Sequence, residues 1–589
     1  MRKILTTVLS VTMLCGVANA IPAKRVPMTV TQSDGSTITV EMRGDEFHHS
    51  FVTKDGLAVA RAENGDFYYR TVTGVSSQMA HDPASRDGGE TAFVNAQKAN
   101  MTLSALAVTN PQSKIRRGAP RKVGSTQVPT TGSPRVPILL VDYKDKKMKH
   151  VKSDFVAQYT SGSTSSYQYF ADQSNGKYTP QFDVYGIYTL NSNRSTYGGN
   201  NYWGNDKGVA RMVGEAVDKA SQSGEIDWSQ YDNDGDGEAD VVIVVYAGVG
   251  EAQASSVSDA VWPCQWSLSS GGSSGDGTGA RTYNNTKIDR FAVFNEINGS
   301  SDNGTRMDGI GTFCHEFSHC LGLPDFYDTR YGGHNGMGSW SLMDYGSYNN
   351  DGYTPIGYDA YEKDFMGWIN LISPKPNTKY TLPVWNQKDE STDKAVKIVS
   401  NINKNEYYIV ENRKAQGWDS YIADKRGGAL ITHVSYVPSR WEDNTPNNQD
   451  VQLMTYFPAD NSMGTWSESA DLYGKSNHEL TDKSSPKAEL YLNKSGTATS
   501  HAGYMGKPLT EINVNSDSSV SFWYIKSDGP AAGDINEDGK VDAGDVTTLV
   551  NYILGLHPNP CNLSVADLNE DGHYDASDVT ELVNLILGR

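Results

Sequence analysis

The feature that most constrains the fold is the segment Gly311–Asp325, where two histidines lie four residues apart within an apolar, periodic pattern. On an α-helix, His315 and His319 would project to the same side and could bind one metal ion. A second set of residues, spaced by three and four positions, is apolar and would bury the helix against a core. This set is Ile310, Phe313, Phe317 and Leu321. The segment therefore predicts a buried helix that presents two metal ligands.

The residues around the two histidines complete a candidate hydrolytic site. Gly322 allows a sharp turn out of the helix, and that turn can bring Asp325 back as a third ligand, which leaves a fourth position for water. Glu316 lies beside the metal and is the natural general base for that water. Two histidines at this spacing also occur by chance as ordinary helix residues, but the added glycine and carboxylate favour a metal site. The ligand set indicates one catalytic zinc ion.

The sequence after the helix resembles a known family of peptidases. Ser341-Leu342-Met343-Asp344-Tyr345 is similar to the methionine turn beneath the metal in the metzincin clan. The aspartate in place of a third histidine, together with the run Gly322–Asp328, resembles the M6 metallopeptidases, the immune inhibitor A family. The resemblance implies zinc on the three ligands, Glu316 as base and proton shuttle, and Met343 as the floor of the site. It also implies that Tyr345 donates to the oxyanion, although Tyr345 could equally pack in the core.

An acidic loop earlier in the chain predicts a calcium site. The segment Asp232–Asp240 offers oxygen ligands at alternating positions, with Gly237 for a tight turn. We expect Glu238 to bind through its main-chain carbonyl and the aspartates to bind through their side chains; these are Asp232, Asp234, Asp236 and Asp240. The alternative is an acidic turn without a ligand. The loop thus predicts one calcium ion in the catalytic domain.

The C-terminal region contains an internal repeat in which residues 534–550 recur 33 positions later. Each copy is an acidic loop with glycine at position 6, followed by one amphipathic helix, and it lacks the entering helix of an EF-hand. The duplicated unit closely resembles a dockerin, a module that docks enzymes onto cohesin-bearing scaffolds. Its positions 10 and 11 are Ala543-Gly544 and Ala576-Ser577, unlike the hydroxyl pairs common in clostridial dockerins. We expect two calcium ions and a possible cohesin partner; the alternative is a calcium-stiffened cap without a partner.

The candidate calcium ligands of the repeat are oxygen-bearing side chains together with position 7 of each loop, where such a loop uses a main-chain carbonyl. They are Asp534, Asn536, Asp538, Lys540, Asp542 and Asp545 in the first copy, and Asp567, Asn569, Asp571, His573, Asp575 and Asp578 in the second.

The N-terminus and the overall composition predict an extracellular protein. A basic start, an apolar stretch from Ile4 to Val17 and the sequence Ala18-Asn19-Ala20 form a secretory signal peptide; the alternative is a buried N-terminal strand. No later apolar run is long enough for a membrane span. Asp and Glu number 70 against 51 Lys and Arg, which argues against a nucleic-acid partner. Cys314 and Cys320 are interpreted as buried small residues, or as half of a bridge to Cys264.

Composition shifts divide the chain into segments. The basic stretch 114–122 is typical of an exposed propeptide junction, or alternatively of an interdomain linker. The predicted propeptide, from residue 21 onward, has no cysteine to block a metal, so its latency group could be Asp45, His48 or His49, or these could form a surface turn. The predicted boundaries are signal peptide 1–20, propeptide 21–118, zinc metallopeptidase catalytic domain 130–376, β-rich domain 377–527, linker 528–532 and dockerin 533–589.

These features predict a multidomain α+β protein with a metzincin-like zincin catalytic domain, a β-rich accessory domain and a small calcium-binding helical dockerin. Its predicted function is secreted zinc-dependent endopeptidase, made as a zymogen and acting on proteins or glycoproteins. The alternative is a catalytically silent zincin-fold adhesion or scaffold-associated protein. The segment Glu406–Arg413 and Trp418-Asp419 are similar to the region after the catalytic domain in M6 relatives. The β-rich region is interpreted either as a support for the cleft or as a glycoprotein- or polysaccharide-binding accessory.

Overall fold

The structure is a computed structural model that describes most of the chain after residue 20. The predicted signal peptide, the whole basic stretch 114–122 and most of the predicted linker lie outside the described residues. The described residues are 21–45, 48–62, 64–109, 128–201, 205–254, 257–271, 277–330, 333–385, 394–448, 450–464, 468–526, 531–569 and 571–587.

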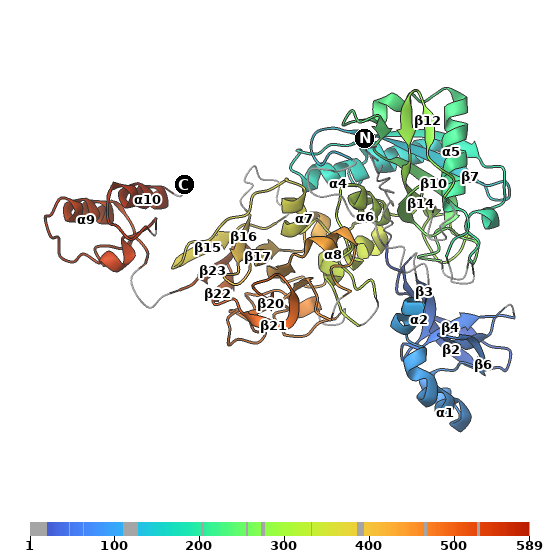
Figure 1. Ribbon diagram of the computed structural model, residues 1–589, viewed down its shortest axis with the longest axis horizontal. Helices are drawn as coiled ribbons and strands as arrows, with labels where there is room; N and C mark the ends of the chain where they lie inside the picture. The colour runs from blue at the N-terminus through green and yellow to red at the C-terminus, as the bar shows by residue number, and fades with distance from the viewer. Residues whose placement is uncertain are drawn as a thin grey trace, which may run out of the picture.

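The centre of the molecule is a mostly parallel sheet with helices on both faces (Figure 1). Its strand order is β11-β14-β10-β7-β8, and the edge strand β11 runs antiparallel to β14. The strands are β7 (Arg135–Asp142), β8 (Gln181–Thr189), β10 (Val242–Val249), β11 (Cys264–Ser267) and β14 (Arg290–Ile297). Strand β10 is buried along its whole length, and its sequence is a continuous apolar run. This is expected for a parallel strand that is covered on both faces of the sheet.

Alternate residues of the central strands enter two different cores. Ile138 and Leu140 pack with the helices on one face, whereas Leu139 and Val141 pack with α5 on the other. This alternation follows from the two-residue period of a strand. The helices are α3 (Lys152–Val156), α4 (Ser166–Gln173) and α6 (Gly311–Cys320) on the first face and α5 (Val209–Ser223) on the second. A small side sheet contains β9 (Glu238–Ala239), β12 (Arg281–Tyr283) and β13 (Thr286–Ile288).

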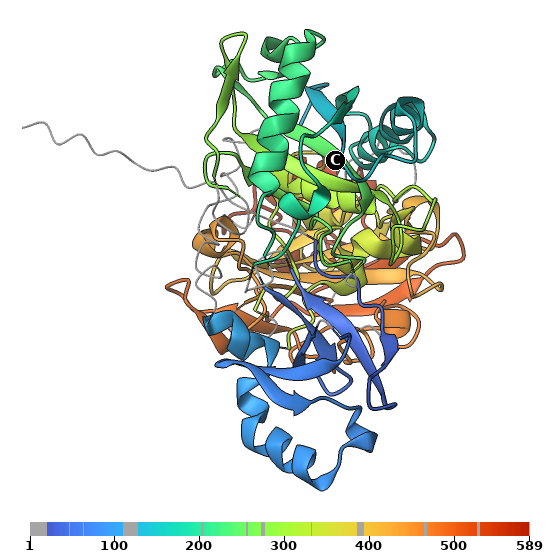
Figure 2. The same cartoon turned by 90° about the vertical axis from the view of Figure 1, so that its right-hand side faces the viewer.

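The N-terminal region forms an antiparallel sheet in which sequential strands are neighbours, from β1 to β6. It lies beside the central sheet and the β-rich region in both views (Figures 1 and 2). Its strands are β1 (Met28–Thr31), β2 (Thr37–Gly44), β3 (His49–Thr53), β4 (Ala58–Arg61), β5 (Phe67–Thr71) and β6 (Gly74–Met79), followed by α1 (Gly88–Gln97) and α2 (Leu103–Thr109).

The region after residue 377 is dominated by antiparallel strands and shares a core with the central domain. In β17, Tyr407 and Ile409 pack with α6 and its neighbours, while Tyr408 and Val410 pack into a second core. One sheet contains β16 (Ala395–Val399), β17 (Glu406–Arg413), β18 (Gly428–Ser435) and β19 (Met454–Tyr456). The others contain β15 (Thr378–Leu382), β20 (Glu489–Leu492), β21 (Ala498–Tyr504), β22 (Leu509–Val514) and β23 (Val520–Tyr524). Two short helices, α7 (Ala360–Phe365) and α8 (Pro438–Glu442), lie next to this boundary.

The C-terminal repeat forms two helices, α9 (Ala543–Ile553) and α10 (Ala576–Ile586), on the side of the molecule opposite the N-terminal sheet (Figure 1). Asp542 and Asp575 cap the two helices in the same way. Its buried core is small, and consists of Ile535, Leu549, Ala566 and Leu582. The chain is thus a multidomain protein of mixed helix and strand. Within the part that the structure describes, we find no helix that is both long and apolar enough to traverse a bilayer.

Candidate metal centre and active-site cleft

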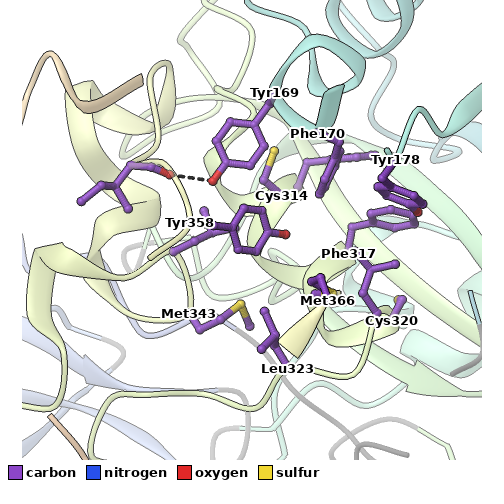
Figure 3. Close-up of a cluster of buried hydrophobic side chains, with 14 of the residues drawn as sticks. Tyr169, Phe170, Tyr178, Cys314, Phe317, Cys320, Leu323, Met343, Tyr358 and Met366 are labelled. Atoms are coloured by element: carbon purple, nitrogen blue, oxygen red, sulfur yellow. Dashed lines mark hydrogen bonds between the residues drawn. The ribbon is translucent and has the colours of Figure 1, made fainter. Parts of the chain in front are cut away.

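Helix α6 is buried from end to end, as the apolar pattern predicts. The ring of Phe313 packs at a tilted angle against Phe294 of β14, and Phe317 packs edge-on against Phe170 of α4. Figure 3 shows Cys314, Phe317 and Cys320 directed toward the aromatic side chains of Tyr169, Phe170 and Tyr178. This packing fixes the rotation of the helix about its axis, and therefore the direction of the two histidines on its other side.

The three predicted metal ligands come together at the end of α6. Nε2 of His315 lies 3.2 Å from Nε2 of His319, and Oδ1 of Asp325 lies 3.2 Å and 3.3 Å from these two nitrogens. Ligand atoms about 2.0–2.1 Å from a tetrahedral zinc ion stand about 3.3 Å apart. The donor atoms therefore have the separations that a zinc ion requires.

Hydrogen bonds orient both imidazole rings toward this triangle. Nδ1 of His315 lies 2.8 Å from the carbonyl oxygen of Leu342, and Nδ1 of His319 lies 2.7 Å from that of Leu323. With Nδ1 protonated as the donor, Nε2 keeps its lone pair for a metal, which is the usual arrangement in protein metal sites. Burial lowers the pKa of His315, so the neutral, ligating form is favoured.

The turn after α6 and the segment around Met343 shape the floor of the site. Gly322 adopts a left-handed φ of 104°, which reverses the chain beyond the helix. The amide of Phe326 donates to the carbonyl of Met343 at 2.8 Å, so the segment that carries Asp325 is tied to the predicted methionine turn. Met343 is fully buried and lies close to Leu323 (Figure 3).

The Asp325 carboxyl is buried and its pKa lies well below the usual range. Burial alone would raise that pKa, but attraction to His319 and interactions with both imidazoles outweigh the cost. The carboxylate form, which a metal ligand requires, is therefore favoured.

The first residues after position 20 lie beside the predicted base. The main-chain nitrogen of Ile21 donates to Oε1 of Glu316 at 2.5 Å. Trp262 Nε1 donates to the carbonyl of Ile21 at 3.2 Å, and the hydroxyl of Tyr348 donates to the carbonyl of Pro22 at 2.8 Å. The sequence did not single out Ile21. The one signal that bears on it is the predicted signal-peptide cleavage directly before it.

The neighbouring residues of this segment make further contacts in the cleft. Lys24 forms an ion pair with Asp351, and its amide donates to the carbonyl of Ala252 at 2.9 Å. The Arg25 guanidinium lies 4.3 Å from the ring centroid of Tyr345, whose pKa is raised by burial. Arg25 and Tyr345 also line a cavity of about 220 Å³ between the N-terminal region and the central domain.

The three predicted latency candidates lie next to this segment. His49 stacks on Trp262 with ring centroids 4.4 Å apart, and its Nε2 is 3.6 Å from Oε1 of Glu251. Asp45 and His48 form a turn through their main chains, and the adjacent Gly44 carbonyl accepts from the amide of Ala23 at 2.8 Å. Among the described residues, the main chain of Ile21 is one group that contacts the Glu316 carboxylate.

The acidic loop 232–240 gathers part of its predicted ligand set. Carboxylate oxygens of Asp232, Asp234 and Asp240 lie within 4.8 Å of one another, and Asp236 is not part of this group. Burial, followed by repulsion from Asp234 and Asp232, raises the pKa of Asp240 to about 7. The side chain of Glu238 forms an ion pair with Lys287 at 2.6 Å, which leaves its main-chain carbonyl as the predicted ligand.

The two loops of the C-terminal repeat fold alike. Asp534 and Asp567 each accept a hydrogen bond from the glycine at position 6 of their loop, at 3.1 and 3.0 Å. Asp545 and Asp578, at position 12, each accept a hydrogen bond from a main-chain amide at the start of their own loop, that of Ile535 and that of Leu568. A metal site can be sought as three histidine, cysteine or acidic side chains whose ligand atoms lie within 4.8 Å of one another. Among the described residues, the candidate zinc site and the loop 232–240 meet this criterion, and the two loops of the repeat do not.

The cysteines of α6 contribute to the core. Cys314 and Cys320 are buried thiols, and burial raises the pKa of both. Within the described residues no disulfide joins either of them to Cys264.

Comparison with known proteins supports a metallopeptidase domain in this part of the chain. Residues 138–369 match the family model for the immune inhibitor A peptidase M6 catalytic domain, and residues 532–587 match the dockerin type I domain. The chain therefore contains a peptidase M6 domain and a dockerin type I domain.

Two of three similar proteins are named as a metalloprotease or a metallopeptidase. Immune inhibitor A of Bacillus thuringiensis subsp. alesti is 29% identical over 234 residues, which are 35% of this chain and 33% of that protein. Pre-pro-metalloprotease PrtV of Vibrio cholerae serotype O1 (strain M66-2) is 28% identical over 230 residues, 34% of this chain and 24% of that protein. A putative secreted metallopeptidase of Arthroderma benhamiae is 33% identical over 91 residues, 13% of each chain. The chain thus spans a third or less of the length of these relatives.

Proposed function

We propose that this protein is a secreted zinc-dependent endopeptidase, made as a zymogen and carrying a calcium-dependent docking module. The observation that carries the proposal is the triangle of His315, His319 and Asp325, set within one helical turn of Glu316 and inside a peptidase M6 domain. His315, His319 and Asp325 would hold the zinc. When bound, zinc supplies a Lewis acid that lowers the pKa of water and polarises a peptide carbonyl.

Glu316 is the general base of this proposal. Its carboxylate accepts a proton from the attacking water and delivers that proton to the leaving amine. The hydrogen bond from the Ile21 nitrogen supports this role, because it shows that an N–H group in the cleft can reach Oε1 of Glu316. Tyr345 is proposed as the donor to the oxyanion. In the zymogen its ring is covered by Arg25.

Latency is proposed to arise from residues 21–25. Removal of the signal peptide after Ala20 would leave the new α-amino group at Ile21, next to Glu316. The contacts of Trp262, Tyr348 and Asp351 with the segment hold it in the position that a substrate would need. Cleavage between the N-terminal sheet and the central domain, in the basic stretch 114–122, would then allow it to leave.

Calcium and partner binding complete the proposal. The loop 232–240 and the two loops of the repeat are proposed to bind one calcium ion each, with the ligands expected from the sequence. The dockerin type I domain supports docking to a cohesin-bearing scaffold outside the cell. Protein or glycoprotein substrates are proposed from the match to a peptidase M6 domain and from the relative named as a metalloprotease.

The test compares the wild type with Glu316→Gln, after removal of residues 21–118, in cleavage of unfolded casein. Calcium is kept in excess, and bound zinc is quantified in both proteins. We expect equal zinc and cleavage by the wild type alone. Equal zinc with no cleavage by either protein would contradict the peptidase proposal and favour a catalytically silent binding protein.

A further inference from the structure

A side chain from the β-rich domain contacts the third metal ligand. Asn444 follows helix α8 and is 3% exposed. Its Nδ2 donates to Oδ2 of Asp325 at 2.6 Å, and its Oδ1 accepts from the main-chain amide of Asp325 at the same distance. We propose that Asn444 is a positioning residue for Asp325, so that the β-rich domain completes the zinc site; this rests on the proposed function.

The two hydrogen bonds determine which oxygen of Asp325 faces the histidines. Oδ2 is held by Asn444, while Oδ1 points to the two imidazole nitrogens at 3.2 and 3.3 Å. The reciprocal bond to the Asp325 amide fixes the main chain as well. A carboxylate held at both its far oxygen and its backbone loses little conformational freedom when it binds a metal, and such outer partners are a general feature of protein metal sites.

An asparagine suits this position for reasons of charge and of backbone geometry. Its amide is neutral, so it satisfies Oδ2 without neutralising the negative charge that the metal would use. Asn444 also has a left-handed φ of 53°, a conformation that asparagine and aspartate tolerate better than other residues with a side chain. That backbone conformation is what turns the side chain toward Asp325.

The loop that carries Asn444 is itself fastened to the metal-binding segment. Asn447 donates through Nδ2 to the carbonyls of Phe326 and Met454, both at 2.6 Å. Trp441 of α8 packs on Phe326, with ring centroids 6.4 Å apart. Two amide side chains, at positions 444 and 447, thus bind the consecutive residues Asp325 and Phe326.

In the alternative interpretation, the β-rich domain acts only as a separate binding accessory. That interpretation does not account for these contacts. A separate accessory would not bury a polar side chain against a residue 119 positions away in the catalytic domain. It would also not share one apolar core with α6, as Ile409 and Leu430 do. The β-rich domain is instead part of the structure that holds the metal ligands.

The test measures zinc affinity in the chain from Ile21 by competition with a chromogenic chelator. Asn444→Asp keeps the size, the acceptor and the tolerance of left-handed φ, but places a carboxylate where Asp325 needs a donor. We expect zinc to bind about 10- to 100-fold more weakly, and the absorption spectrum of the cobalt-substituted protein to change. The matched control is Asn412→Ala, which removes another buried amide of this domain with two hydrogen bonds. It should lower the unfolding temperature and leave zinc affinity within about twofold.

A double-mutant cycle distinguishes positioning from a general structural role. In an Asp325→Ala background, Asn444→Asp should change zinc affinity less than about twofold, because the carboxylate it positions is gone. An equal loss in both backgrounds, or unchanged affinity and cobalt spectrum in Asn444→Asp, would overturn the inference while leaving the zinc site intact. Failure of the wild type itself to bind zinc would overturn the metal site, and the inference with it.

Discussion

The main-chain nitrogen of Ile21 lies 2.5 Å from Oε1 of Glu316, although 295 positions separate the two residues. The base proposed for hydrolysis is therefore engaged by the first residue that would follow the signal peptide. A substrate amide and the N-terminal segment would compete for the same group. Contacts that hold this segment should therefore control the basal activity of the uncleaved chain.

Reversing the charge of Lys24 should weaken this block. Lys24→Glu in the chain from Ile21 replaces an ion pair with Asp351 by repulsion. We expect basal cleavage of a short fluorogenic peptide to rise about fivefold, the equivalent of about 1 kcal/mol for a partly exposed pair. Lys54→Glu is the control, since it breaks a pair with Asp82 that lies within the N-terminal region and away from residues 21–25. An equal rise in both variants would show that general loosening of the sheet is responsible.

A buried arginine links the β-rich domain to the methionine turn. Arg413 is fully buried, pairs with Glu411 at 2.7 Å and Asp419 at 2.9 Å, and donates to the carbonyl of Trp340 at 3.1 Å. Arg413→Met leaves two buried carboxylates without their cation and should destabilise the protein by about 3–5 kcal/mol. The shift of the urea unfolding midpoint measures this loss.

The control for that prediction is Arg426→Met in the same domain. Arg426 also pairs with an aspartate, Asp424, at 2.8 Å, but its side chain is 42% exposed. Its partner Asp424 is buried, but the Arg426 guanidinium itself contacts water, so the loss of Arg426 should cost about 1 kcal/mol, less than that of Arg413. Comparable losses for the two arginines would contradict the role assigned to burial.

The stability of the protein should depend on pH through Asp471. Burial raises the pKa of Asp471 to about 6, while the hydrogen bond from Trp340 Nε1 at 2.8 Å opposes the rise. Between the ordinary value of 3.8 and about 6, the folded state holds a proton that the unfolded state has lost, so stability falls as pH rises through this window. Asp471→Asn removes this dependence and should gain up to about 3 kcal/mol over the wild type between pH 4 and pH 7. Unfolding midpoints of both proteins at the two pH values test this, and a difference that does not change with pH would contradict it.

Calcium should reverse the sign of one substitution in the loop 232–240. Asp234 lies close to the carboxylates of Asp232 and Asp240. Without calcium, Asp234→Asn relieves repulsion and should raise the melting temperature; with calcium, it removes a ligand and should lower it. Asp227→Asn serves as the control, because Asp227 lies outside the loop and its Oδ1 accepts hydrogen bonds from the main-chain amide and the hydroxyl of Ser229. Shifts of the same sign for Asp234→Asn in both conditions would argue against a calcium site here.

Local patterns in the sequence were sufficient to predict the helix and the turn that carry the proposed metal ligands. The histidine segment predicted as a buried helix corresponds to α6, and the turn predicted at Gly322 directly follows it. These predictions succeed because burial on one face or on both leaves a periodic signal in neighbouring residues. The proximity of His315, His319 and Asp325 follows from one helical turn and one glycine turn.

Contacts between distant segments left no such signal. Ile21 reaches Glu316, and Asn444 reaches Asp325, only because separate sheets pack together. Nothing in the residues around position 444 indicates which carboxylate its amide will meet. For the same reason the sequence left the role of the β-rich region open, whereas the structure shows that it shares a core with α6.

The most direct measurement is anomalous diffraction at the zinc absorption edge from crystals of the chain from Ile21. The account predicts one strong peak at about 2.0–2.1 Å from Nε2 of His315, Nε2 of His319 and Oδ1 of Asp325. The peak should vanish in crystals of His319→Ala. A zinc peak bound elsewhere, or none at this triangle in crystals grown with excess zinc, would contradict the central claim.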